Sequence, residues 1–188
     1  MSALTGLFSA FGLSASAGLN AYIPLLVIAV LARFTHWIEL SPPWNTLTHP
    51  AVIAVLVVLT GIEFFADKVP AVNHFNDAIQ TFVRPVAGAI AFAAGSGAIG
   101  DMHPALAMIA GLLIAGSVHA TKSLAVRPAV SVATAGTGHA PVSMMEDVAA
   151  TTLSLIAVLV PLALVLVAFL VLLWAFRWRR RVQTKSNG

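Results

Sequence analysis

The stretch from Val148 to Trp178 is apolar almost throughout, and only Pro161 interrupts it. About 20 apolar residues are enough for a helix to cross the hydrocarbon core of a bilayer, and this stretch is longer than that. A backbone in lipid must satisfy its own hydrogen bonds, which restricts spanning segments to helices and closed barrels. Several further apolar runs precede this one. The sequence therefore predicts an all-α membrane protein, a polytopic helical bundle.

Composition excludes a water-soluble domain. The chain is 59% hydrophobic and 9% charged, whereas soluble domains are about 45–50% apolar and about 25% charged. Its 188 residues allow one bundle of roughly four to six embedded segments. We expect a single transmembrane helical domain over residues 1–176 and a basic tail over 177–188. The chain has no cysteine, so disulfides and thiolate metal sites are excluded.

The net charge of +3 comes from the tail and does not indicate nucleic-acid binding. Half of the ten basic residues lie there: Arg177, Arg179, Arg180, Arg181 and Lys185. Basic residues beside a hydrophobic helix normally stay on the cytoplasmic side. We therefore expect an integral protein of the bacterial inner (plasma) membrane, with a cytoplasmic C-terminus, membrane lipids as partners and no nucleic acid.

The first apolar run, from Leu4 to Phe34, is longer than one span requires. Small residues, Gly18, the polar Asn20 and Pro24 cluster in its middle. Such a cluster favours a kink or a discontinuous helix. Asn20 is therefore a candidate for a polar site at the break.

Further spans are expected over 51–65, 86–99 and 105–118. The stretch Pro70 to Pro85 has apolar side chains at helical spacing and polar ones opposite them, so it predicts a short amphipathic helix. Such a segment is too short to span and would lie at the interface or be re-entrant. Arg84 and Arg127 each precede a proline, and we expect a chain bend at both.

Charged residues at membrane depth are the main functional signal, because each costs at least about 2.5–3.5 kcal/mol on insertion scales. Glu63 and Asp67 lie four apart and share one helix face, where they repel. A bound cation, a basic side chain from another helix, or protonation of one carboxylate would relieve the repulsion. The pair is therefore a candidate cation or proton site. Alternatively, it is the solvated end of a helix.

A weak internal repeat adds to this signal. Polar residues end the second and fourth spans, and each of these ends is followed by Val-Arg-Pro, at 83–85 and 126–128. Repeated halves with broken helices point to a transporter site; chance similarity is the alternative. His119 at the second such end is either a proton relay or a hydrogen-bonding group.

The segment before the last span predicts a helix start. Ser143 and Glu146 have capping-box spacing, and acidic residues are favoured in a first turn. No nucleotide-binding, hydrolase or metalloprotease motif is present, and the six histidines are scattered. We therefore expect no enzyme, no cofactor and no histidine metal site.

Several segments together resemble an uncharacterised membrane family, domain of unknown function 4126. They are Ala17-Gly-Leu-Asn20-Ala-Tyr22-Ile-Pro24, Ile62-Glu63-Phe-Phe-Ala-Asp67-Lys68-Val-Pro70, Asn76-Asp77, Val83-Arg84-Pro85-Val-Ala-Gly88, His119-Ala-Thr-Lys122, and Ser143 with Glu146-Asp147. The resemblance covers nearly the whole chain and implies no established activity. The chain departs from the family's pattern at Asn73 and His139, where Asp and Asn are expected.

The leading hypothesis is a small transporter or channel that moves an ion or a small polar solute through a site lined by intramembrane polar residues. The expected site residues are Asn20, Glu63, Asp67, Lys68, Asn76, Asp77, Arg84, His119, Lys122, Arg127, Glu146 and Asp147. One alternative is a scaffold or assembly partner in which ion pairs only fix helix register. Another is a flippase or membrane enzyme with Arg84, Lys122 and Arg127 as lipid-phosphate ligands. Glycines such as Gly88 permit close helix contact, and we expect a homo-oligomer.

Overall fold

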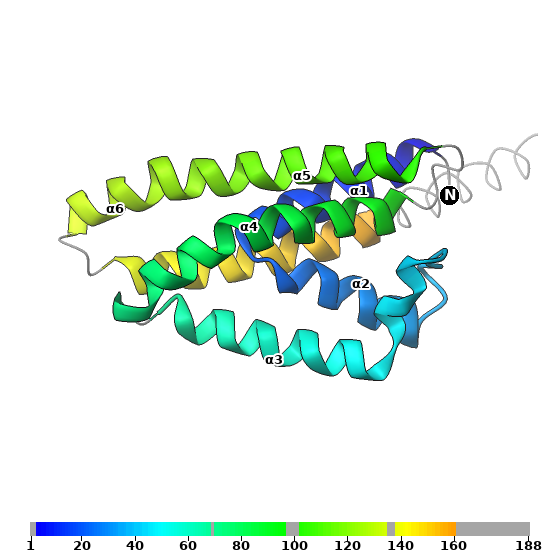
Figure 1. The fold of residues 1–188 in the computed structure, drawn as a ribbon, viewed down its shortest axis with the longest axis horizontal. Helices are drawn as coiled ribbons and strands as arrows, with labels where there is room; N and C mark the ends of the chain where they lie inside the picture. The colour runs from blue at the N-terminus through cyan, green and yellow to red at the C-terminus, as the bar shows by residue number, and fades with distance from the viewer. Residues whose placement is uncertain (1–2, 69, 97–101, 135–137, 161–188) are drawn as a thin grey trace, which may run out of the picture.

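The computed structural model describes residues 3–68, 70–96, 102–134 and 138–160, and this part of the chain is an all-α membrane protein. Its helices run side by side along one axis (Figure 1). They are α1 Ala3–Leu19, α2 Tyr22–Phe34, α3 Pro50–Ala66, α4 Pro70–Gly95, α5 Pro104–Thr121 and α6 Arg127–Thr134, with the short η1 Trp44–Thr48, the π-helical turn η3 Lys122–Val126 and the helix His139–Val160. Three stretches are long and apolar enough to cross a bilayer: Phe75–Gly95, Pro104–Thr134 and His139–Val160.

The first apolar run is a hairpin of two half-length helices. The predicted break is confirmed and lies at Asn20 and Ala21, between α1 and α2. The break reverses the chain: Ser9 near the start of α1 and Ile28 in α2 line the same small cavity. In Figure 1 the N-terminus and the far end of α2 accordingly lie at the same end of the bundle. The structure therefore has a re-entrant hairpin whose tip is inside the bundle.

The sequence predicted a short separate helix over 70–85, and this prediction is wrong. The segment continues through Pro85 as part of one helix of 26 residues that ends at Gly95. Proline removes a backbone hydrogen bond and normally bends a helix. Here the ring of Pro85 faces Gly116 of α5, which has no side chain. A Cβ added to Gly116 would lie 3.8 Å from Pro85 Cγ. The helix therefore does not end at Arg84, although Figure 1 shows that α4 changes direction about its middle.

The helix is not interrupted at Arg127, the second position where a bend was predicted. Helices α5 and α6 are joined by the π-helical turn η3 into one apolar helix, Pro104–Thr134. The backbone N–H of Arg127 bonds to Lys122 O, a spacing of five residues. This wider turn absorbs Pro128 without ending the helix. The two Val-Arg-Pro stretches thus both lie within continuous helices but in different local structures: one is α-helical inside α4, and the other joins the end of the π-helical turn η3 to the start of α6.

The last described helix begins at His139, before the predicted capping box. Ser143 therefore lies inside the helix and does not cap it, and its hydroxyl has no hydrogen-bond partner. The helix packs on α1 through serine hydroxyls: Ser9 Oγ donates to Ala157 O at 2.6 Å, and Ser16 Oγ to Ala150 O at 2.7 Å. The end of the predicted closing span and the basic tail lie outside the described residues.

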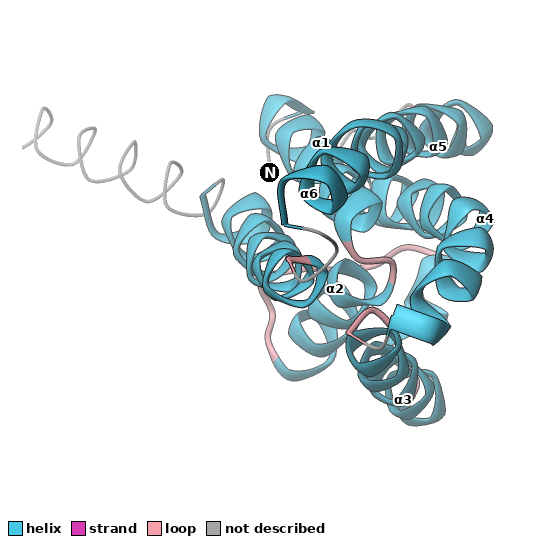
Figure 2. Ribbon diagram, turned by 90° about the vertical axis from the view of Figure 1, so that its left-hand side faces the viewer, coloured by secondary structure: helices cyan, strands magenta, loops and turns pink. Residues whose placement is uncertain are grey.

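Glycines bring α1, α4 and α5 into backbone contact within one chain (Figure 2). A Cβ added to Gly111 would lie 2.3 Å from Gly88 O, and one added to Gly88 would lie 2.2 Å from Ala115 Cβ. Gly95 likewise faces the backbone of Ala10. The glycines that predicted contacts between copies therefore serve, at these positions, contacts between helices of the same chain.

We predict that Gly111→Ala lowers the free energy of unfolding by about 1–3 kcal/mol, because the new methyl must push α4 and α5 apart. Gly61→Ala is the matched control, since a Cβ there meets nothing within 4 Å; it should be neutral or slightly stabilising. Equilibrium unfolding in mixed micelles, followed by circular dichroism, measures both. Equal losses for the two variants would contradict the packing argument.

Candidate functional site

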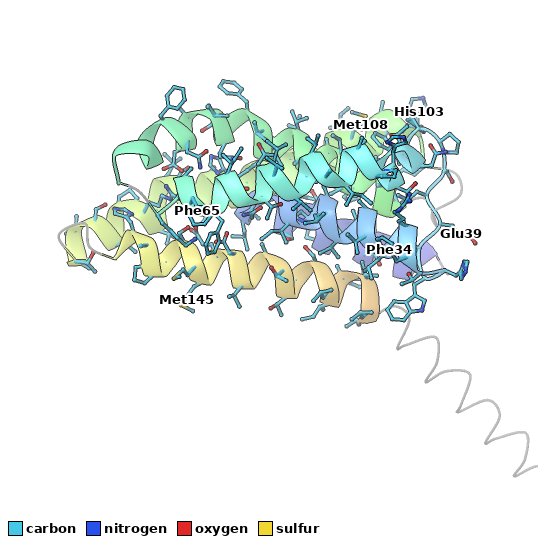
Figure 3. The ribbon with its side chains drawn as sticks, turned by 90° about the horizontal axis from the view of Figure 1, so that it is seen from below. Phe34, Glu39, Phe65, His103, Met108 and Met145 are labelled. Carbon is cyan, nitrogen blue, oxygen red and sulfur yellow. The ribbon has the colours of Figure 1, made fainter. Side chains whose placement is uncertain are left out.

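All twelve predicted site residues lie in hydrogen-bonded or ion-paired contacts with one another. They come from the hairpin tip, from the end of α3, and from α4, the helix Pro104–Thr134 and the helix His139–Val160. We call them the polar centre: Asn20, Glu63, Asp67, Lys68, Asn76, Asp77, Arg84, His119, Lys122, Arg127, Glu146 and Asp147. Glu39, in contrast, is exposed at the end of the bundle away from Phe65 and Met145 (Figure 3).

Arg84 joins the two carboxylates of α3. Its Nη2 lies 2.9 Å from Glu63 Oε1 and 3.5 Å from Asp67 Oδ2, and all three side chains are buried. A basic side chain from another helix was one of the three predicted ways to relieve repulsion between these carboxylates, and it is confirmed. The alternative of a solvated helix end is wrong. The polar face of α4 at Arg84 likewise points into the bundle and not outward to water.

Asp67 is surrounded by positive charge. Besides Arg84, its Oδ2 lies 3.5 Å from Arg127 Nη2 and 3.9 Å from Lys122 Nζ. Its Oδ1 accepts a hydrogen bond of 2.6 Å from Asn76 Nδ2. Three cations and an amide donor together compensate the buried carboxylate. Asp67 is therefore the electrostatic centre of the cluster.

The π-helical turn η3 places Lys122 and Arg127 on the same side of their helix. In an α-helix, residues five apart point in different directions, whereas a turn with bonds five residues apart aligns them. Both cations accordingly reach Asp67 and also Glu146, at 2.6 Å from Lys122 and 4.0 Å from Arg127. Arg127 also pairs with Asp77 on α4. Such turns occur often at functional sites.

A second group holds the hairpin tip. Asn20 Oδ1 accepts hydrogen bonds from the backbone N–H groups of Tyr22 and Ile23, at 3.1 Å each, so Asn20 caps α2. Its Nδ2 donates to Asp147 at 3.0 Å, and Asp147 pairs with Lys68 at 3.2 Å. The tip is therefore held in place by the loop after α3 and by the helix His139–Val160.

The end of α1 is bound to the larger group. Lys122 Nζ donates to the backbone oxygen of Leu19 at 3.2 Å. A cation is favourable at this position, because carbonyl groups at a helix C-terminus have no partner in the helix. The two half-helices thus end at the polar centre with opposite dipole ends, and each is bound by a polar side chain.

His119 of α5 contacts α4 at two residues, Arg84 and Thr81. Arg84 Nη1 lies 3.3 Å from His119 Nδ1, and arginine can only donate, so Nδ1 is the acceptor. The ring proton is then on Nε2, 3.3 Å from Thr81 Oγ1. Thr81 in turn donates to the backbone oxygen of Asp77 at 2.8 Å.

Sequence reasoning did not include Thr81 and Gln80 in the site. Gln80 is buried and lies one helical turn before Arg84, so the two share a face of α4. That spacing is visible in the sequence and could have indicated it. The hydroxyl of Thr81 gave no such signal, because threonine at a helix surface is common. Tyr22, from the start of α2, lies near Glu63, Gln80 and Arg84.

The charges of the polar centre do not balance. Besides His119, it contains five carboxylates and four basic side chains, two lysines and two arginines, which leaves one negative charge when all nine are ionised. Three buried atoms on facing parts of α3 and α4 also have no hydrogen-bond partner: Glu63 Oε2, Gln80 Oε1 and Arg84 Nε. Among the described residues, no group of three or more acidic or histidine side chains has the arrangement of a metal site.

An open pocket of about 530 Å³ lies beside the polar centre. Its walls come from Leu19 at the hairpin tip, from the helix Pro104–Thr134 and from the helix His139–Val160. Most of the lining is apolar, for example Val118 and Ala149, and Lys122 and Glu146 also line it. Their ion pair is therefore accessible from the side of the bundle.

We predict that Asp67→Asn lowers the free energy of unfolding by about 3 kcal/mol, because three buried cations lose their shared counter-charge. Glu39→Gln is the matched control: it removes an exposed carboxylate outside the polar centre and should change stability little. Denaturant unfolding of the two purified variants measures the difference. Similar unfolding midpoints would show that Asp67 does not hold the cluster together.

Comparison with known proteins agrees with the resemblance noted in the sequence. No curated protein and no solved structure matches the chain. The family described as "Domain of unknown function (DUF4126)" matches residues 7–181, which include every member of the polar centre. The chain belongs to this family of unknown function.

Proposed function

We propose that the protein is a small membrane transporter or channel that moves an ion or a small polar solute, with the polar centre as its binding site. The observation that carries this proposal is the convergence of twelve polar residues from separate helices onto the tip of a re-entrant hairpin. Irregular backbone at membrane depth is tolerated where it is buried in protein or lines a cavity, and discontinuous helices are where transporters place their sites.

The charge balance supports a positively charged cargo or coupling ion. One uncompensated carboxylate in a site shielded from water is costly, and a proton or a monovalent cation would neutralise it. The hairpin supports binding at the same place, because the end of α1 presents carbonyl oxygens and the start of α2 presents N–H groups. The lateral pocket offers a route to Lys122 and Glu146.

The alternatives have weaker support. If the ion pairs only fixed helix register, four cations would need only four carboxylates. If Arg84, Lys122 and Arg127 bound a lipid phosphate, each would have to leave a carboxylate that it already contacts. We further propose a bacterial inner-membrane location with a cytoplasmic C-terminus and a homo-oligomeric state, on the basis of the basic tail and of the small size of the bundle.

We predict that proteoliposomes carrying the protein conduct protons or Na⁺ at least tenfold faster than protein-free vesicles. Glu63→Gln and Lys122→Met should each reduce that flux at least tenfold, because each removes one member of the polar centre. Glu39→Gln should leave it unchanged. An internal pH dye follows protons and a radioactive tracer follows Na⁺, with the membrane potential clamped. Vesicles no leakier than empty ones to both ions, or equal flux in all variants, would overturn the proposal.

We predict that filling the lateral pocket slows the flux without unfolding the protein. Ala149→Phe places a ring among the pocket residues, whereas Val148→Phe, its neighbour on the exposed surface of the same helix, is the matched control. The same vesicle assay, with circular dichroism to check folding, compares them. Equal flux in the two variants would show that the pocket is not on the route.

A further inference from the structure

Glu63 differs from the other carboxylates of the polar centre. It is 1% exposed, and one cation contacts it, Arg84, through Oε1 alone. Its second oxygen, Oε2, is buried and has no hydrogen-bond partner. Asp67, one turn later, is contacted by three cations and one amide. Asp77 Oδ1 and Glu146 Oε2 also have no hydrogen-bond partner, but their side chains are 25% and 11% exposed, so Glu63 is the most deeply buried carboxylate with such an oxygen.

Pairing the charges one to one leaves two carboxylates, Glu63 and Asp67, to share one cation. Lys122 pairs with Glu146, Lys68 with Asp147 and Arg127 with Asp77. The remaining cation, Arg84, lies between Glu63 and Asp67. Arg84 is nearer to Glu63, at 2.9 Å against 3.5 Å, but Asp67 also has Lys122 at 3.9 Å and Arg127 at 3.5 Å. Glu63 is then the carboxylate with the least counter-charge, because the one cation that contacts it is shared with Asp67.

Protonation would satisfy the atoms around Glu63. A neutral carboxylic acid is one O–H donor that still accepts at its other oxygen. Oε1 would keep its bond from Arg84, and Oε2 would become a donor. Gln80 Oε1 is a buried acceptor without a partner, one turn before Arg84 on the same face of α4. A proton on Glu63 Oε2 would thus provide the donor for a hydrogen bond to Gln80 Oε1, and both of these atoms otherwise lack a partner.

We propose that Glu63 is the proton-binding site of this protein, and that its acid form donates a hydrogen bond to Gln80. The charged and titratable groups that face Glu63 are Arg84 of α4, Asp67 of its own helix, Lys122 and Tyr22, with His119 behind Arg84. The inference rests on the proposed function in one respect, since it identifies the coupling ion of that transporter as a proton. The release of this proton would return the net charge of −1 to the polar centre, which makes Glu63 the switch between two charge states.

Infrared spectroscopy tests the protonation state directly and needs no substrate. The full chain, reconstituted in lipid bilayers at pH 7, should show the C=O stretching band of a protonated carboxylic acid, which shifts in D₂O. Labelling the glutamates with ¹³C distinguishes a glutamic-acid band from an aspartic-acid band. Substitution then identifies which of the three glutamates, Glu39, Glu63 and Glu146, carries the band. We expect Glu63→Gln to abolish the band, Glu39→Gln and Glu146→Gln to keep it, and Gln80→Leu to shift its frequency.

The variants also keep the test informative if one of them fails to fold. Glu63→Gln mimics the neutral acid in shape and should melt at a temperature close to that of the wild type, whereas an amide in place of a needed carboxylate would lower it. Wild-type protein without a glutamic-acid band at pH 7, or a band that survives in folded Glu63→Gln, would overturn the assignment. An unfolded Glu63→Gln variant would also overturn the assignment, because a site that holds a neutral carboxylic acid should tolerate an amide of the same shape.

The outcomes separate this inference from the proposed function. A glutamic-acid band that depends on Glu63, together with vesicles no leakier than empty ones, would overturn the transporter and leave the protonated Glu63 standing. Flux that depends on Glu63 without such a band would overturn the proton site and leave the transporter, with Na⁺ or another monovalent cation bound at the carboxylate.

Discussion

The requirement that buried charges compensate one another organises this structure. A carboxylate or ammonium group taken out of water is stabilised only by partners inside the protein. Asp67 meets this requirement for three cations that come from α4 and from the helix Pro104–Thr134. The same cations also form ion pairs with Glu63, Asp77 and Glu146. The positions of α3, α4 and two long helices thus depend on one carboxylate at the end of α3.

The hairpin depends on the same charges. Two half-length helices leave backbone groups without partners at their tip, and lipid offers no water to satisfy them. Asn20 and Lys122 supply the missing partners, one for the start of α2 and one for the end of α1. Because Asn20 is itself held by Asp147, the tip and the ion pairs stabilise each other. The irregular backbone and the buried charges are therefore one structural unit.

How much the sequence revealed depended on how local each interaction is. The spacing of Glu63 and Asp67 on one helix face predicted a compensating partner, and the cluster around Asn20 predicted a broken helix; both were confirmed. The helices continue through Pro85 and Pro128, because the packing of Pro85 near Gly116 and a π-helical turn before Pro128 are tertiary and backbone effects that a proline pattern does not show. Thr81 was missed because a neutral polar side chain carries no large burial cost that would single it out, whereas the spacing of Gln80 from Arg84 was visible in the sequence.

The difference between a bundle held together by ion pairs and a transport site lies in the fifth carboxylate. Register alone is best served by equal numbers of opposite charges, since any surplus adds a desolvation cost without a contact in return. In the described residues Glu63 and Asp67 share Arg84, and Glu63 is the one of the two that has no further cation in contact. Its free oxygen, an amide oxygen and a guanidinium nitrogen on facing parts of α3 and α4 all lack hydrogen-bond partners. A carboxylate in such surroundings is what the proposed binding and release of a positive charge would require.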